Sequence, residues 1–388
     1  MRLRLSSRLD GFRSYLGTEM NARLSAMREA GVDVINLGLG DPDFEPPSHL
    51  LRSLKKAVEE PSYHHYPSFY SGLPLREAIS SWYEKRFGVK LDPEREVLPL
   101  LGSSDGVFHI HQCLLDTGDM ALVPSPGYPS YEAGVRIAGG EVVYVPLLKK
   151  NHFLPDLDAI PPKIAERAKM IWVNYPNNPT SAIATGEFFR RLIDWAYRFD
   201  VVVVHDNPYS EIFFEGYRPP SFLEFEGAKE VGVELHSLSK SYNCCGWRVG
   251  MVVGNSTIVQ ALAKIKSHAD RGIYYPLQVA AMEALNGPTA FMEQRNRVVQ
   301  ERRDVLVSGL KALGFEMESP KATFYLWASI PGGHPSHEFC LNILEKTGVW
   351  MMPGSMYGQW GEGFVRAALT LPIEKLEEAV RRLARAFS

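Results

Sequence analysis

Six short runs with the pattern of β-strands constrain the fold more than any other feature of this chain. Most of them are nearly continuous apolar stretches in which polar and apolar residues do not alternate. Strands buried on both faces have this pattern, and such strands occur in mainly parallel sheets that helices cover on both sides. The runs span residues 120–123, 142–145, 170–173, 201–204, 233–236 and 249–253.

Helical periods separate these runs from about residue 50 to 285. The clearest helix spans residues 74–87, with Pro74 in its first turn and Gly88 just past its end. After Pro288 the pattern changes to a long charged helix at 294–313, short strands at 323–330, 349–352 and 364–369, and helices at 336–347 and 372–387. A chain of 388 residues exceeds what one core usually fills. We therefore expect an α/β protein with a large domain at 46–287, and a smaller α+β domain formed by 1–45 with 288–388.

Charge and composition exclude several function classes. A net charge of -3 gives no reason to expect nucleic acid or an anionic membrane as a partner. No apolar run reaches the length of a transmembrane helix, and the first residues lack the apolar region of a secretory signal, so we expect a cytoplasmic protein. The four cysteines show no metal-ligand spacing, and we expect no metal.

The segment from Ser237 to Gly250 combines an amine, a guanidinium and several small hydroxyls. Lys240 stands between two serines, and Arg248 stands between Val249 and Trp247, close to two glycines. This set suits a phosphorylated aldehyde, because the amine can form a Schiff base and the guanidinium can hold the phosphate in bidentate fashion. The alternative is a solvated lysine and arginine on a surface loop.

Two further segments place polar groups where a ligand of such a sheet would lie. Ser103 and Ser104 open a predicted helix, where free backbone amides can bind an anion or where the serines simply cap the helix. Asp206 follows the strand at 201–204, and a carboxylate at a strand's carboxyl end could keep a pyridine nitrogen protonated. Tyr209 could then donate to a ring oxygen. The alternative for Asp206 is turn capping.

Three more candidates follow strands or lie within one. Asn178 stands in an Asn-Pro turn after the strand at 170–173 and could donate to the same ring oxygen, or mark an ordinary turn. Tyr128 could cover one face of a flat ring or seal the core. Arg366 lies inside a predicted strand, where a buried guanidinium requires a carboxylate from a substrate or from the protein itself.

With these motifs in this order, the chain resembles the class I/II, fold type I pyridoxal-phosphate aminotransferases from Gly38 to its last helix. The resemblance implies a large domain with a mainly parallel central sheet sandwiched by helices. It implies that Lys240 forms the Schiff base with pyridoxal 5'-phosphate and moves the proton. The implied cofactor contacts are Ser103, Ser104, Tyr128, Asn178, Asp206, Tyr209, Ser237 and Arg248. The implied substrate contacts are Gly40, Asn178 and Arg366.

The resemblance also implies a homodimer with shared active sites, in which Tyr66 reaches the phosphate of the neighbouring subunit. The spacing after Tyr66 is one residue longer than is common, and Ser181 stands where the family usually has glycine. The loop at 270–276 looks most like the diaminopimelate and alanine branch of the family. Arg271 is atypical in that loop, and either serves a substrate carboxylate or faces solvent.

The implied activity is transfer of an amino group between an L-amino acid and a 2-oxo acid. We expect glutamate and 2-oxoglutarate as one pair, with diaminopimelate, alanine or aspartate as candidate partners and with Tyr15, Phe324 and Tyr325 as pocket candidates. The alternative is a pyridoxal-phosphate-dependent C–S lyase that carries out β- or γ-elimination on the same scaffold, because the motifs do not separate the two activities.

Overall fold

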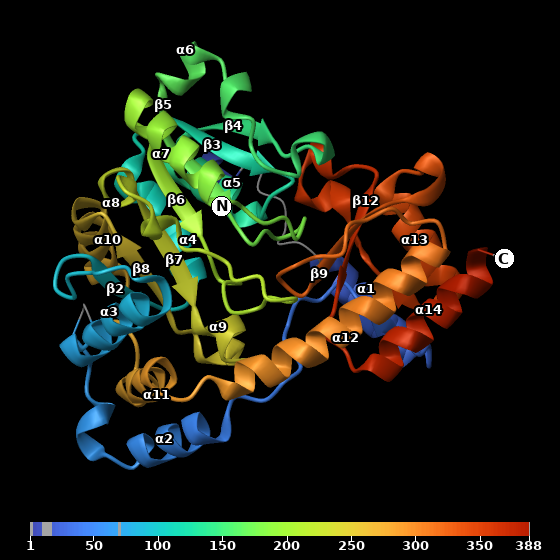
Figure 1. Cartoon of the computed structure of the whole chain (residues 1–388), viewed down its shortest axis with the longest axis horizontal. Helices are drawn as coiled ribbons and strands as arrows, with labels where there is room; N and C mark the ends of the chain where they lie inside the picture. The colour runs from blue at the N-terminus through green and yellow to red at the C-terminus, as the bar shows by residue number, and fades with distance from the viewer. Residues whose placement is uncertain (1–2, 10–17, 69–70, 388) are drawn as a thin grey trace.

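A seven-stranded sheet forms the centre of the larger part of the protein (Figure 1). The computed structural model describes residues 3–9, 18–68 and 71–387. The strand order is β2-β8-β7-β6-β5-β3-β4, with β3 to β7 parallel, β8 antiparallel to β7 and β2 antiparallel to β8. The strands are β2 (Val97–Leu100), β3 (Met120–Ser125), β4 (Glu141–Pro146), β5 (Ala168–Asn174), β6 (Val202–Asp206), β7 (Gly232–Ser237) and β8 (Gly250–Gly254).

Helices cover both faces of this sheet. Apolar residues of α4, α5 and α10 form one buried cluster with one face, and those of α3, α7 and α11 form another with the opposite face. Successive strand residues supply the two clusters in turn, as with Ile171 and Trp172, which explains the continuous apolar runs. The helices are α2 (Ser48–Val58), α3 (Leu73–Phe87), α4 (Ser103–Leu114), α5 (Pro129–Ala138), α6 (Pro162–Ala165), α7 (Gly186–Phe199), α8 (Ala228–Val231), α9 (Leu238–Ser241), α10 (Ser256–Ala269) and α11 (Tyr275–Asn286).

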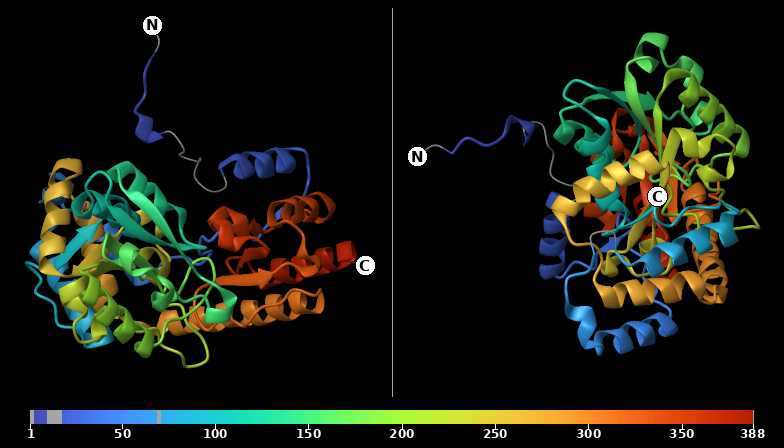
Figure 2. Two further views of the ribbon diagram at one scale, coloured as in Figure 1. Left: turned by 90° about the horizontal axis from the view of Figure 1, so that it is seen from above. Right: turned by 90° about the vertical axis from the view of Figure 1, so that its left-hand side faces the viewer.

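The C-terminal part, orange to red in Figure 2, is built around a smaller antiparallel sheet, whose strand order is β11-β12-β9. Its strands are β9 (Tyr325–Ser329), β11 (Met352–Pro353) and β12 (Phe364–Ala368), and its helices are α12 (Ala290–Ala312), α13 (Ser336–Thr347) and α14 (Ile373–Phe387). The N-terminal segment adds α1 (Thr18–Glu29) and β1 (Ile35–Asn36), and β1 pairs with β10 (Val349–Trp350). This pairing supports the predicted division into 46–287 and 1–45 with 288–388, which remains a prediction.

The predicted fold class is confirmed, and all six apolar runs are strands. β2 was not predicted from the sequence, and it contains Pro99, a residue type that is unfavourable in a central strand. The structure places β2 at the edge of the sheet, where proline is tolerated. The run predicted as one strand at 349–352 is divided at Met351 into β10 and β11, which join two different sheets.

Two features sought along the chain are not found in the described residues. No helix there is long and apolar enough to cross a membrane. Within the same residues, no three His, Cys, Asp or Glu side chains lie close enough together to hold a metal ion.

Candidate active site

A cavity of about 300 Å³ opens between the two parts of the protein, at the carboxyl ends of β5, β6 and β7. Ligands of open α/β sheets bind at this edge. Eleven of the predicted catalytic, cofactor and substrate residues line this cavity, as does the predicted pocket residue Tyr325. The eleven are Gly40, Ser103, Ser104, Tyr128, Asn178, Asp206, Tyr209, Ser237, Lys240, Arg248 and Arg366. The structure therefore brings together groups from positions far apart in the chain.

Lys240 lies in the single helical turn α9, which follows β7 directly. Ser237 caps this turn, and its hydroxyl oxygen accepts from the backbone N–H of Ser239 at 3.1 Å. The Lys240 amine donates to the carbonyl oxygen of Gly40 at 2.8 Å and lies 3.5 Å from the sulfur of Cys245. Burial raises the pKa of the Cys245 thiol, although the nearby Lys240 lowers it. The amine thus points into the cavity beside a neutral thiol.

Asp206 ends β6 and is almost completely buried. Its Oδ2 accepts from the hydroxyl of Tyr131 at 2.7 Å, while its Oδ1 has no hydrogen-bond partner within the described part of the chain. Burial raises the pKa of Asp206 to about 6, and the hydrogen bond from Tyr131 acts in the opposite direction. One carboxylate oxygen is therefore held by the protein and the other is left for a ligand donor.

Tyr131 is a site residue that the sequence analysis missed. It lies in the first turn of α5, three residues after the N-cap residue Tyr128, stacks on Trp172 with ring centroids 4.4 Å apart, and lines the cavity. The spacing of three residues after Tyr128 was the available signal, because such residues share one face of a helix.

Arg366, on β12, also lines the cavity. Its guanidinium donates to Asn178 Oδ1 at 2.8 Å and to the carbonyl oxygen of Gly38 at 2.6 Å, and it lies 4.1 Å from the ring centroid of Tyr325. Tyr325 also contacts Tyr209, with 3.3 Å between their hydroxyl oxygens. Burial raises the pKa of Tyr209 well above its usual value, so its hydroxyl stays protonated and can donate.

A third region of the cavity suits an anion. The backbone turn at Gly102 begins α4, and a Cβ there would lie 2.4 Å from a terminal nitrogen of Arg248. Only glycine lets the guanidinium approach this closely. Ser103 and Ser104 form the first turn of α4, where backbone N–H groups lack partners within the helix. Ser103, Ser104, Ser237 and Arg248 all line the cavity.

Ser181 shows how the chain accommodates its departure from the family pattern. Its backbone has φ of 58°, a left-handed conformation that glycine adopts more easily than serine. Its hydroxyl donates to the carbonyl oxygen of Tyr325 at 2.6 Å and accepts from Thr323 at 3.0 Å. The serine therefore ties the Asn-Pro turn to β9.

The remaining predicted residues lie outside this cavity or outside the described residues. Tyr66 is 83% exposed, and the guanidinium of Arg271 lies 5.4 Å from its ring centroid. Neither is among the described residues that line the cavity. Phe324 is buried, with its ring centroid 5.5 Å from the Lys240 amine, and Tyr15 falls outside the described residues.

Comparison with known proteins gives one consistent result. Residues 32–383 match the family "Aminotransferase class I and II". LL-diaminopimelate aminotransferase from Dehalococcoides mccartyi is 49% identical over 383 residues, which are 98% of each chain. The enzyme of the same name from Halothermothrix orenii is 47% identical over 378 residues, 97% of each chain. Substrate-bound BacF from Bacillus subtilis has a TM-score of 0.96 at 38% identity, covering 100% of this chain and 98% of BacF.

These likenesses extend over nearly the whole chain, and the relatives match at full length. The family resemblance seen in the motifs around Lys240 and Asp206 is therefore confirmed, as is the dependence on pyridoxal phosphate that it implied. The chain belongs to the class I and II aminotransferases and is a pyridoxal-phosphate-dependent transaminase.

Proposed function

We propose that this cavity transfers an amino group between an L-amino acid and a 2-oxo acid, with Lys240 as the catalytic amine and Arg366 as the α-carboxylate site. One observation carries this assignment. The Lys240 amine and the Arg366 guanidinium are anchored by the carbonyl oxygens of Gly40 and Gly38, two positions on one short segment. A substrate whose carboxylate binds Arg366 therefore presents its Cα near the amine.

The cavity residues fit pyridoxal phosphate. The buried Oδ1 of Asp206, which lacks a partner within the described residues, suits a protonated ring nitrogen. The glycine-dependent approach of Arg248 to the start of α4 suits the phosphate. Ser103, Ser104 and Ser237 would complete that phosphate site. Tyr209 and Asn178 would donate to the ring hydroxyl, and Tyr128 would cover one ring face. When bound, the cofactor supplies an aldehyde that condenses with amines and a ring that withdraws electrons from the substrate Cα.

The residues of the chain bind and orient the substrate and move its proton. Arg366 binds the substrate carboxylate through its planar fork and so fixes the orientation of the Cα–H bond. Lys240 Nζ would take the proton from Cα and deliver it to the carbon that the cofactor's aldehyde supplies. Asp206, as a carboxylate, holds the proton on the ring nitrogen. The Asn178 side chain, whose Oδ1 accepts from Arg366, has its amide nitrogen left to donate to a ligand.

We further propose LL-diaminopimelate as a substrate, with glutamate and 2-oxoglutarate as the second pair. The support is the name shared by the full-length relatives, which are LL-diaminopimelate aminotransferases. Alanine and aspartate, the other candidates, are expected to react more slowly. The C–S lyase alternative is not favoured, because these relatives are transaminases.

We also propose that the protein works as a homodimer with shared active sites. Tyr66 supports this assembly, because a tyrosine that is 83% exposed in one chain is available to a second copy. Small amino acids and 2-oxo acids are then its other partners. A cytoplasmic location remains a prediction.

A half-reaction tests the proposed function. The holoenzyme is mixed with LL-diaminopimelate, glutamate, alanine or aspartate in separate reactions, and the cofactor absorbance and free ammonia are followed. We expect LL-diaminopimelate and glutamate to convert the cofactor to its amine form without releasing ammonia. Ammonia release with the aldehyde form retained would instead identify a lyase, and faster conversion by alanine or aspartate would contradict the proposed substrates.

A further inference from the structure

Arg295 is a buried cation that the proposed mechanism does not use. It lies near the start of α12, the long helix that runs from the large part of the protein into the C-terminal part (Figure 1). Its side chain is 4% exposed, and burial lowers its pKa to about 10, which still leaves it charged at neutral pH. A charge so deeply buried is costly unless its donors are satisfied, and the identity of its acceptors therefore indicates its role.

The acceptors of Arg295 include the backbone of Lys240 itself. One terminal nitrogen donates to the carbonyl oxygens of Lys240 at 2.9 Å and Ser241 at 2.6 Å. The other donates to the carbonyl oxygen of Glu211 at 2.5 Å and to Asn296 Oδ1 at 3.0 Å, and Nε donates to the same Oδ1 at 3.2 Å. These bonds account for all five N–H groups of the guanidinium.

The Lys240 turn requires such a donor from outside. The helix α9 has four residues, and the last four carbonyl groups of a helix have no donor within it. Arg295 supplies donors to two of them, and a cation at a helix C-terminus is also electrostatically favourable. The backbone that carries the catalytic amine is thus fixed by a side chain from another element.

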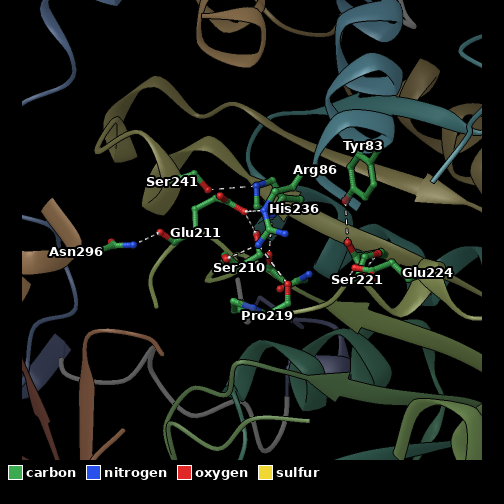
Figure 3. Close-up of polar contacts among 12 residues, drawn as sticks. Tyr83, Arg86, Ser210, Glu211, Pro219, Ser221, Glu224, His236, Ser241 and Asn296 are labelled. Carbon is green, nitrogen blue, oxygen red and sulfur yellow. Dashed lines mark hydrogen bonds and ion pairs between the residues drawn. The ribbon is translucent and has the colours of Figure 1, made fainter. Parts of the chain in front are cut away.

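Three of the residues that Arg295 contacts, Glu211, Ser241 and Asn296, belong to a wider polar network (Figure 3). Asn296 Nδ2 donates to the Glu211 carbonyl oxygen at 3.1 Å, and the Glu211 carboxylate accepts from Arg86 Nε at 2.8 Å. The Ser241 hydroxyl lies 3.2 Å from His236 Nε2, so the turn is also tied to β7. These contacts leave the guanidinium little freedom to move.

The same helix also contacts the segment around Gly40, the residue that accepts from the Lys240 amine. Further along α12, Arg302 forms a two-pronged ion pair with Asp43, both contacts 2.7 Å long. Asp43 is three residues after Gly40, whose carbonyl oxygen accepts from the Lys240 amine. The backbone of Lys240 and the acceptor of its amine are therefore both fixed to α12.

We propose that Arg295 is a positioning residue that sets the direction of the Lys240 amine by holding the carbonyl oxygens of its turn. This inference rests on the proposed role of Lys240. A displacement of about 1 Å at a reacting group can lower a rate on the order of 100-fold. Arg295 therefore affects the chemical step while leaving substrate binding at Arg366 largely intact.

The test compares Arg295→Lys with the matched control Arg303→Lys in the holoenzyme. Arg303 is similarly buried on the same helix, but it donates to Pro320, Glu215 and Asp304, which lie outside the described lining of the cavity. Lysine keeps the charge and loses the fork. For Arg295→Lys we expect kcat to fall about 10- to 100-fold, with KM for the amino donor changed less than about threefold. We also expect the pH midpoint of the Lys240–cofactor absorbance to shift by about half a unit or more.

The control should lose thermal stability to a similar extent while keeping kcat within about threefold and an unshifted midpoint. If Arg295→Lys does not fold, Asn296→Ala decides the matter, because it keeps the guanidinium and removes the oxygen that accepts two of its N–H groups. The midpoint should then shift in that variant too. Equal effects of the Arg295 or Asn296 change and the control on kcat and midpoint overturn the proposal. Borohydride labelling of the wild type at a lysine other than Lys240 would instead overturn the proposed function.

Discussion

Removing the Tyr131 hydroxyl should change the titration of Asp206. In Tyr131→Phe, Asp206 Oδ2 loses its donor at 2.7 Å, while Oδ1 already lacks a partner within the described residues. A hydrogen bond to a charged group stabilises it by roughly 1.5–3 kcal/mol, which corresponds to about 1–2 pKa units. The pKa of Asp206 should therefore rise further above its present value of about 6 in the cofactor-free protein.

The sign of the effect on stability follows from proton linkage. Because the pKa of Asp206 rises on folding from 3.8 to about 6, the folded protein binds more protons than the unfolded chain between these values. Stability contributed by this group is fully present below about pH 4 and is lost as the pH rises to about 6, by on the order of 3 kcal/mol. In Tyr131→Phe the loss should continue for about 1–2 further pH units.

Denaturant unfolding of the cofactor-free protein between pH 4 and 8 measures this loss. Tyr175→Phe is the matched control, because it removes another buried hydroxyl, one that donates to Phe153 rather than to a carboxylate. Each variant is also compared with the double variant that carries Asp206→Asn in addition, which separates the titration of Asp206 from that of other groups. The reasoning is refuted if Tyr131→Phe and Tyr175→Phe show the same pH dependence.

Five further substitutions, at four residues, probe the cavity and the turn beside it. Arg248→Ala should weaken cofactor affinity by about 1.5–3 kcal/mol, whereas Asp206→Ala should lower the rate far more than the affinity. Pyridoxal phosphate is titrated into both cofactor-free variants, and a larger loss of affinity in Asp206→Ala than in Arg248→Ala contradicts these roles. Arg366→Lys should weaken α-amino acids and 2-oxo acids alike, and an equal loss on an amine without a carboxylate would show a structural role. Ser181→Ala should lower the free energy of unfolding by about 1–3 kcal/mol, because the Tyr325 carbonyl loses a buried donor. Ser181→Gly should lower the free energy of unfolding by about 1 kcal/mol less than Ser181→Ala does, since glycine relieves the left-handed strain. Calorimetry that finds the glycine variant less stable than the alanine variant contradicts this.

Sequence patterns predicted the parts of the fold that local chemistry determines. The strand that ends at Asp206 and the helix after Gly72 carry their signals in composition and in turn residues, and both are where they were expected. The strand containing Pro99 was not predicted, because the edge position that makes proline acceptable depends on the order of all seven strands.

The site residues, too, could be predicted from the sequence only where short motifs carry the signal. Lys240, Arg248 and Asp206 stand in short motifs whose residue types indicate chemistry, and the structure gathers them at one cavity. Tyr131 and Arg295 act on those residues through contacts 75 and 55 positions away in the chain. Such contacts follow from how α5 and α12 pack, which composition and periodicity do not encode.

The central claim is that Lys240 carries the cofactor, and one measurement tests it most directly. The holoenzyme is reduced with borohydride and digested, and the peptide bearing the cofactor is sequenced by mass spectrometry. The label is predicted on Lys240, and Lys240→Ala should lose both the label and turnover while keeping its fold. Recovery of the label on another lysine, or turnover by Lys240→Ala, would contradict the account.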